Sequence, residues 1–243
     1  MAKKKKKKKF SLYYLIAGLA LGILALNIIL GVIRKPAHLL NPISKLFYKV
    51  PSQTWNSYKD VFSSYETDIL DAHFLAALAQ TESSGNPIAT AYWQFSFKQD
   101  ILSIFQPASS SIGLYQMTYD TFEDAKRFCF LNGEVRADDN RANLKICWKN
   151  NFRFRFLVSD SVSLTSARLH YYTQKVLKKY KGAVSKLKQQ QLAAIIQLCG
   201  PNRASSFIRN GFSVKSMGLC GSHSVPAYVA RVFKYKKIFE SID

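Results

Sequence analysis

Hydrophobic residues follow two different patterns along this chain of 243 residues. Residues 10–33 carry no charged side chain, whereas six later stretches repeat apolar residues at the three- and four-residue spacing of a helix with one buried face. These stretches are 54–65, 71–82, 118–130, 161–180, 188–199 and 226–240. Alternating runs typical of β-strands are scarce. The pattern predicts a mainly α-helical domain with a separate apolar segment in front of it.

The uncharged segment 10–33 is long enough to cross a lipid bilayer. As an α-helix its 24 residues would extend about 36 Å, more than the ~30 Å of a hydrocarbon core. Seven lysines, Lys3–Lys9, precede it and only Arg34 and Lys35 follow closely, and positive residues favour the cytoplasmic side. The sequence therefore predicts a transmembrane helix with a cytoplasmic N-terminus. The alternative is a cleaved signal peptide, because residues 20–22 place small side chains at cleavage spacing.

The rest of the chain divides into a spacer and one domain. Residues 34–52 contain three prolines and little periodicity, which predicts a spacer between membrane and domain. Residues 53–243 are expected to fold as a single unit. The predicted organisation is thus a cytoplasmic polylysine segment at 1–9, a transmembrane helix at 10–33, the spacer, and the domain.

The cysteines are consistent with export. The chain has four, which are Cys129, Cys147, Cys199 and Cys220. They form no CxxC pair and have no histidine at a ligand spacing, so no metal site is expected. In an oxidising compartment they would form two disulfides, and pairing each cysteine with its sequence neighbour closes the shortest loops. Four buried free thiols are the alternative.

The charge balance indicates anionic surroundings. The formal net charge is +20, which favours nucleic acid, a membrane surface, or an acidic polymer such as a bacterial cell wall. A nucleic-acid partner is not expected, because no basic recognition motif occurs beyond Lys3–Lys9. The sequence also lacks a phosphate-binding glycine loop, an HExxH motif and an evident catalytic triad. No cofactor is therefore expected.

One predicted helix ends in a candidate catalytic residue. Asp71 is a plausible N-cap of the helix over 71–82, and Gly85 follows its end. Glu82 lies four residues past Leu78 and seven past Leu75, so its carboxyl group points toward the apolar face. Partial burial would raise its pKa and suit it to donate a proton near neutral pH. The alternative is a partly exposed glutamate hydrogen-bonded to a nearby donor.

Four motifs occur in order along the predicted domain. They are Glu82-Ser83-Ser84-Gly85-Asn86-Pro87, Gly113-Leu114-Tyr115-Gln116-Met117-Thr118, Ala193-Ala194-Ile195-Ile196 running into Cys199-Gly200-Pro201, and Tyr228-Val229-Ala230-Arg231-Val232. Together they resemble the lytic transglycosylases that have a goose-type lysozyme-like domain. The resemblance extends over residues 67–240. It implies a mainly α, lysozyme-like fold for the domain behind the transmembrane helix.

The resemblance also implies a role for each matched residue. Glu82 would be the only catalytic acid and base, and the Tyr228 hydroxyl would lie near its carboxylate. Gln116 would line the sugar groove, flanked by Tyr115 and Met117. The implied substrate-binding set is Ser83, Gly113, Tyr115, Gln116, Met117 and Tyr228. Without the resemblance, Gln116 is a loop amide and Tyr228 a core aromatic residue.

The chain departs from the family pattern at three places. Many relatives have a serine nine residues after the catalytic glutamate, where this chain has Ala91. Ser109–Ser111, just before the second motif, are candidates for its substrate-positioning role. Leu198 replaces the asparagine of the third motif. Tyr92–Pro107, rich in aromatic residues, is predicted to be an insertion.

The activity implied by the resemblance is cleavage of peptidoglycan between N-acetylmuramic acid and N-acetylglucosamine with formation of a 1,6-anhydro ring. The domain would lie in the periplasm on a single-pass inner-membrane anchor, or outside a cell that has one membrane. A lysozyme is one alternative, in which Asp100, Asp120, Glu123 or Asp124 would activate water. A non-catalytic wall-binding protein is another. Wall turnover, division and wall opening for an envelope-spanning machine are all compatible with such an enzyme.

Overall fold

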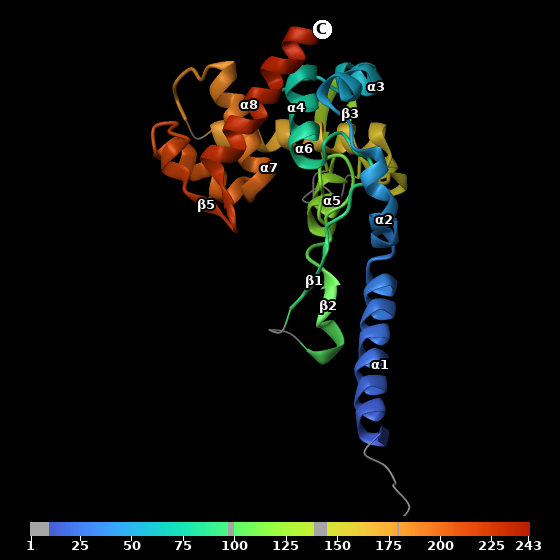
Figure 1. Cartoon of the computed structure of the whole chain (residues 1–243). Coiled ribbons are helices and arrows are strands. Elements are labelled where there is room, and N and C mark those ends of the chain that lie inside the picture. Colours follow the sequence, from blue (N-terminus) through green and yellow to red (C-terminus); the bar gives the residue numbers. More distant parts are fainter. Residues whose placement is uncertain (1–9, 97–99, 139–144, 179) are drawn as a thin grey trace, which may run out of the picture.

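The computed structural model describes residues 10–96, 100–138, 145–178 and 180–243 (Figure 1). It is 63% helical, which confirms the predicted mainly α class. Its helices of seven or more residues are α1 (Phe10–Arg34), α3 (Pro51–Ser64), α4 (Ala72–Ser83), α5 (Tyr119–Ala125), α6 (Val158–Leu177), α7 (Lys186–Arg209) and α8 (Val225–Ile242). The strands form antiparallel pairs, which are β1 (Trp93–Phe95) with β2 (Phe105–Pro107), β3 (Phe128–Leu131) with β4 (Glu134–Ala137), and β5 (Leu219–Cys220) with β6 (His223–Ser224).

One predicted helix is wrong over its second half. The helix expected at 118–130 ends at Ala125, and the following residues form β3, which pairs with β4. The turn between these strands is Asn132-Gly133, and both residues have positive φ. An Asn-Gly pair at this position favours a tight hairpin turn, so local turn chemistry outweighs the helical spacing of the apolar residues.

Helix α4 is the central element of the core. Nine of its 12 residues are buried, and it contacts α3 on one side and α8 on the other. The predicted N-cap is confirmed, because the Asp71 carboxylate accepts a hydrogen bond from the Phe74 backbone N–H at 2.9 Å. The helix ends where Ser84 and Gly85 both adopt positive φ. This ending places Glu82 in the last turn of a largely buried helix.

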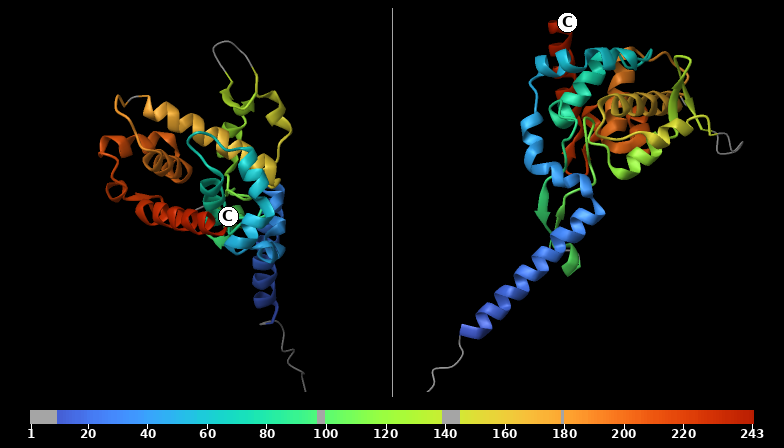
Figure 2. Two further views of the ribbon diagram at one scale, coloured as in Figure 1. Left: turned by 90° about the horizontal axis from the view of Figure 1, so that it is seen from above. Right: turned by 90° about the vertical axis from the view of Figure 1, so that its right-hand side faces the viewer.

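Helix α1 extends away from the body of the domain (Figures 1 and 2). Within Leu12–Arg34, an 18-residue stretch has a mean hydropathy of 2.6, and most of its surface is exposed. A membrane anchor and a signal sequence both fit this description.

The predicted spacer forms short helical turns that contact the domain. They are η1 (Pro36–Leu40), α2 (Asn41–Ser44) and η2 (Lys45–Phe47). The Asn86 side chain donates a hydrogen bond to the Ser44 carbonyl at 2.6 Å, and the Lys49 N–H donates to the Ser84 carbonyl at 2.8 Å. The segment is therefore attached to the end of α4, next to Glu82.

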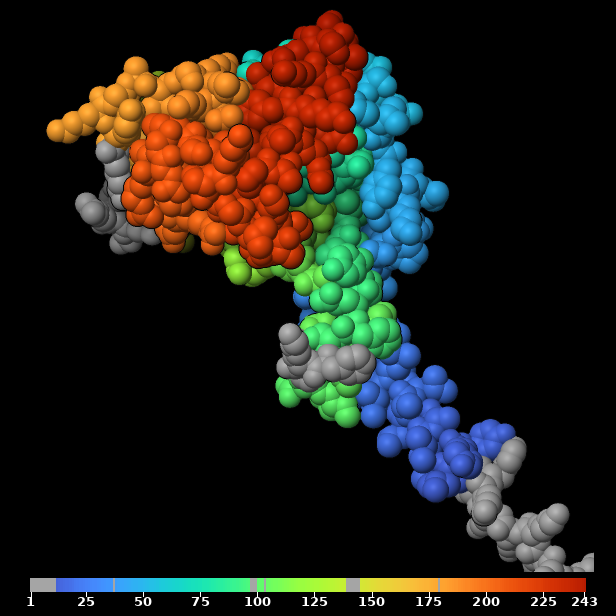
Figure 3. Space-filling model, turned by 60° about the vertical axis from the view of Figure 1, so that its left-hand side comes forward, coloured from blue at the N-terminus to red at the C-terminus, as the bar shows by residue number. Residues whose placement is uncertain are grey.

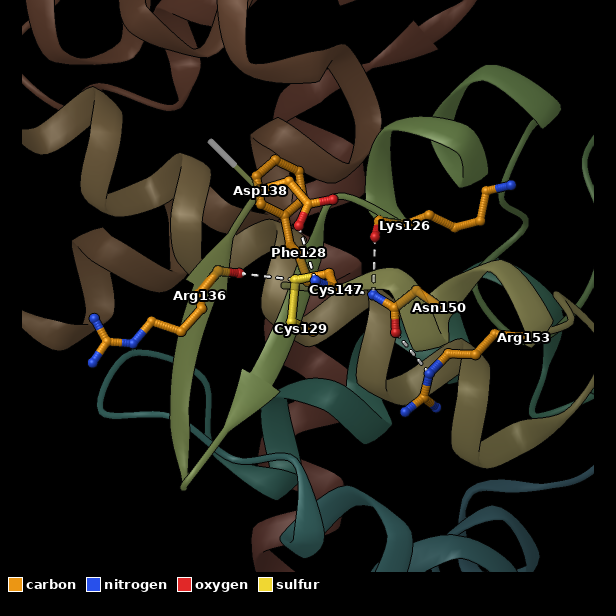
Figure 4. The surroundings of a disulfide bond; sticks show 8 residues. All are labelled: Lys126, Phe128, Cys129, Arg136, Asp138, Cys147, Asn150 and Arg153. Carbon is orange, nitrogen blue, oxygen red and sulfur yellow. Dashed lines mark hydrogen bonds between the residues drawn. A yellow bond between two sulfur atoms is a disulfide. The ribbon is translucent and has the colours of Figure 1, made fainter. Parts of the chain in front are cut away.

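Both predicted cysteine pairs lie at disulfide distance, Cys129 with Cys147 and Cys199 with Cys220. The first joins β3 to a short helix, η4 (Trp148–Phe152), whose Asn150 side chain donates hydrogen bonds to two backbone carbonyls before and within β3 (Figure 4). The second joins α7 to β5, and Cys199 directly precedes Gly200, where non-helical backbone angles interrupt α7. Each closes a loop of about 20 residues, and such a crosslink stabilises a domain by about 3 kcal/mol in the chain-entropy description.

Candidate active site

An open groove of about 720 Å³ lies at the C-terminal end of α4. It is formed by the spacer turns α2 and η2, the end of α4, the chain on either side of the β1–β2 hairpin, and the β5–β6 turn. Its lining residues are Asn41, Ser44, Lys45, Tyr48, Glu82, Ser83, Ser84, Ala89, Thr90, Ala91, Tyr92, Ala108, Ser109, Ser111, Gln116, Ser222 and His223. Most of these side chains are small or polar, so the groove suits a hydrated, hydroxyl-rich ligand more than an apolar one.

Glu82 is the one carboxylate among these lining residues. Burial of its carboxyl group raises the pKa of Glu82 to about 7, against an ordinary value of 4.5. Hydrogen bonds from Tyr228 and Gln197 and the positive charge of Arg231 act in the opposite direction and limit the rise. The Tyr228 hydroxyl donates to Glu82 Oε1 at 2.5 Å. Near neutral pH both protonation states of this carboxyl group are therefore accessible.

The Ser83 side chain holds the second motif against α4. Its single hydroxyl hydrogen is shared between the carbonyls of Leu114, at 2.8 Å, and of Ala79, at 3.1 Å. Ser83 also lines the groove, as the resemblance implies, but its hydroxyl is engaged with backbone. Its main effect is to fix the distance between Glu82 and the turn that carries Gln116.

Gln116 lies in the groove with its amide held in place. Its Nε2 donates to the carbonyls of Ala89 at 3.1 Å and of Gly113 at 3.0 Å, which leaves the amide oxygen available as an acceptor. Gly113 itself does not line the groove. Its φ is +82°, and a Cβ there would come within 2.2 Å of the Arg155 carbonyl oxygen, so packing against that backbone, rather than approach to a sugar, requires glycine.

Tyr115 and Met117 do not flank the groove, contrary to what the resemblance implies. Both are buried, at 0% and 2% exposure, and the Tyr115 hydroxyl donates to the Leu75 carbonyl at 3.1 Å inside the core. Gln116 lies between them and faces outward with positive φ, so its two neighbours face inward. Tyr228 is also buried and reaches the groove only through Glu82.

Two of the three candidate serines lie in the groove with Glu82. Ser109 and Ser111 line it and their hydroxyl groups are hydrogen-bonded to each other. Ser110 points elsewhere, because its hydroxyl accepts a hydrogen bond from the Tyr119 N–H at 3.0 Å. The Thr90 hydroxyl, beside Ala91, accepts a hydrogen bond from the Asn41 side chain at 3.1 Å.

Gln197 and Arg231 are neighbours of Glu82 that were not predicted from the sequence. The sequence contains a feature that could have identified each of them. Gln197 directly precedes Leu198, where the family motif would place an amide, and its Nε2 donates to the Tyr115 carbonyl at 3.0 Å. Arg231 is the arginine of the fourth motif, one helical turn after Tyr228. The contribution of Asn41, Ser44, Lys45 and Tyr48 to the groove had no sequence signal.

The other carboxylates considered for catalysis lie outside the groove lining. Asp124 accepts hydrogen bonds from Arg168 and Tyr172, each at 2.8 Å, and Glu123 pairs with Lys126 at 2.7 Å. Asp100 and Asp120 are not among the lining residues either. Within the described part of the chain, no group of three or more His, Cys, Asp and Glu side chains is arranged to hold a metal ion.

Comparisons with known proteins give no family. No protein-family model matches the chain, and no curated protein is significantly similar to it.

The raised pKa of Glu82 predicts a stabilising effect of Glu82→Gln. Because its folded-state pKa exceeds its unfolded value, the folded state loses stability as pH rises from about 4.5 to about 7 and stays at the lower level above that. Glutamine resembles the neutral acid and avoids this loss. We expect Glu82→Gln to increase the free energy of unfolding by at most about 3 kcal/mol at about pH 8 and to change it little at about pH 4. Thermal unfolding measures both values. Equal effects at both pH values would contradict a buried, raised-pKa carboxyl group.

Proposed function

We propose that this protein is a membrane-anchored lytic transglycosylase of peptidoglycan, with Glu82 as its acid and base. The observation that carries the proposal is a single carboxyl group, with its pKa raised to about 7, in an open polar groove that has no second carboxylate in its lining. The order of the four motifs, from Glu82 to Tyr228, supports the same activity.

The first step needs protonated Glu82. Its proton passes to the glycosidic oxygen between N-acetylmuramic acid and N-acetylglucosamine, and the bond to the muramoyl anomeric carbon breaks. Positive charge develops at that carbon. In a lysozyme a second carboxylate would stabilise this charge or activate water, and the groove lining offers none. The substrate's own N-acetyl oxygen can take this role by bonding to the anomeric carbon.

The second step needs ionised Glu82. It accepts the proton of the muramoyl C6 hydroxyl, whose oxygen then attacks the anomeric carbon and displaces the N-acetyl oxygen. The product is a 1,6-anhydro ring, and Glu82 is protonated again. Tyr228, Gln197 and Arg231 stabilise the ionised state that this step requires, because each lowers the pKa of Glu82. Burial raises the pKa of Glu82 and these three groups lower it, so the carboxyl group can act first as an acid and then as a base near neutral pH.

Polar groups of the groove supply hydrogen bonds to a sugar chain. Two backbone contacts of the Gln116 NH₂ group hold its amide oxygen in place. Ser109 and Ser111 line the groove together with Ala91, which occupies the position where many relatives have a serine. Lys45 and His223 add positive or ionisable groups near a polymer that carries carboxylates. The net charge of +20 favours the same anionic partner.

The products of peptidoglycan digestion test this proposal. The full chain in detergent is incubated with purified wall, and the released fragments are analysed by mass spectrometry. We expect 1,6-anhydro-muramoyl ends, each lighter by one water than its hydrolysed counterpart. Reducing ends alone would make the protein a lysozyme. Binding to the wall without release of fragments would make it a wall-binding protein.

We also propose that α1 is retained as an anchor, with the domain in the periplasm of an inner-membrane protein. The uncharged segment 10–33 after Lys3–Lys9 and the two disulfide pairs support this location. Protease added to intact spheroplasts should digest the domain, while a cytoplasmic marker stays intact. Protection until lysis would place the domain on the cytoplasmic side, and a protein that lacks its first residues would indicate signal cleavage.

A further inference from the structure

The outer half of α1 is covered on one side by the β1–β2 hairpin. The hairpin comprises Trp93–Phe95 and Ile101–Pro107 and projects from the domain alongside the helix (Figures 1 and 2). In the space-filling view the hairpin and α1 touch below the body of the domain (Figure 3). The segment that the sequence identifies as an insertion therefore lies against the segment that it identifies as a membrane span.

Asn27 bonds the helix to the hairpin. It is a polar residue in the apolar segment, and only 2% of it is exposed. Its Nδ2 donates to the Ile101 carbonyl at 2.9 Å, and its Oδ1 accepts from the Phe105 N–H at 3.2 Å. Two backbone groups of the hairpin thus find partners on α1. Polar backbone groups near a bilayer need such internal partners, because lipid tails supply none.

Close packing and a further hydrogen bond fix the hairpin nearer the domain. The Trp93 ring lies against Gly31, where an added Cβ would come within 2.9 Å of it. The Phe105 ring contacts the tilted rings of Trp93 and Phe95, with centroid distances of 5.2 Å and 4.6 Å. The Lys35 ammonium group donates to the Pro107 carbonyl at 3.4 Å. These contacts hold the hairpin at one height along α1.

That height coincides with the outer edge of the bilayer. A hydrocarbon core that begins at Phe10 is crossed after about 20 helical residues, near Leu30. Asn27 lies about 4.5 Å before that edge and Gly31 just after it, at the rise of an α-helix. The aromatic cluster around Trp93 is then at the level where tryptophan and tyrosine are enriched in membrane proteins.

The hairpin exposes three large apolar side chains. Phe95 is 60% exposed, Ile101 57% and Leu102 41%. Ile101 carries the carbonyl that bonds Asn27, Leu102 is the next residue, and Phe95 pairs with Phe105 across the hairpin. The exposed surface of α1 continues beside them. Asp100 is exposed next to Ile101, and a carboxylate at this height can reach the headgroup region.

The geometry points to an interfacial membrane contact: the β1–β2 hairpin inserts Phe95, Ile101 and Leu102 into the outer leaflet of the bilayer that α1 spans. The occupant of this apolar surface is lipid, because the surface is continuous with α1 and lies at the outer end of its apolar stretch. The inference rests on the proposed retention of α1 and does not depend on any catalytic activity.

The contact would also set the height of the groove. Tyr92 and Ala108, at the base of the hairpin, line the groove together with Glu82. A hairpin that is inserted in the outer leaflet keeps Tyr92 and Ala108 close to the membrane surface. The groove is then presented to glycan strands that lie next to the membrane.

Depth measurements on the full chain test the contact. The native cysteines are paired, so single added cysteines, Phe95→Cys or Leu102→Cys, can carry a fluorescent label in reconstituted phospholipid vesicles. Leu187→Cys on α7, 53% exposed, is the matched control away from α1. We expect lipids with a nitroxide near the headgroup to quench most of the fluorescence at 95 and 102 and little at 187. Iodide in the water should give the reverse order.

Three results would overturn the inference. Labels at 95 and 102 that iodide quenches as strongly as the label at 187 would place the hairpin in water. Labels shielded from both lipid nitroxide and iodide would show that protein, such as a second copy, covers the surface. Failure of the protein to float with the vesicles would contradict both the membrane anchor and the hairpin contact. None of these results affects the product assay, so failure here is distinct from failure of the proposed activity.

Discussion

Replacing Glu82 by Gln should lower the release of peptidoglycan fragments by about 10²–10⁴, the usual contribution of a positioned general acid or base. The change keeps the size of the side chain and its ability to accept a hydrogen bond from Tyr228. It removes both the proton that the leaving oxygen needs and the base that later takes the C6 proton. The initial rate of fragment release from purified wall measures the effect.

The matched control for this substitution is Glu123→Gln. Glu123 is one of the carboxylates that a lysozyme mechanism would use, and it pairs with Lys126 away from the groove lining. We expect this variant to keep nearly full activity. A large loss in Glu123→Gln would favour hydrolysis with a second carboxylate. Unchanged activity in Glu82→Gln would exclude Glu82 from the mechanism.

Activity should fall about tenfold per pH unit above about pH 7, because the first step uses protonated Glu82 and its pKa is about 7. Tyr228→Phe should move this decline to higher pH. The Tyr228 hydroxyl donates to the carboxylate and lowers the pKa of Glu82, so its removal raises that pKa further. The maximal rate should fall less than in Glu82→Gln. The pH profile of kcat/KM measures both effects.

The control for the pH profile is Tyr119→Phe, at an exposed tyrosine on α5. Its decline should coincide with that of the unaltered protein. A shift of the Tyr228→Phe profile to lower pH would contradict the assigned hydrogen bond. A rate that rises steadily through the neutral range would mean that Glu82 is not needed in its protonated form.

The local features of the site could be predicted from the sequence. The N-cap at Asp71, the apolar repeat of α4 and the positive-φ residues after it depend on neighbours within a few positions. These features were enough to place Glu82 at the end of a buried helix. The two cysteine pairs were also predictable, because the closure of short loops favours sequence neighbours.

Only the tertiary structure decided which residues surround Glu82 and which face the groove. Tyr115 and Met117 belong to the matched motif but are buried, because the Tyr115 hydroxyl finds its partner on α4 and Gln116 takes the outward position. The spacer residues line the groove because contacts such as the hydrogen bond from Asn86 to the Ser44 carbonyl hold the spacer against the end of α4. The pKa of Glu82 depends on burial by groups far apart in the chain, and such desolvation has no local sequence pattern.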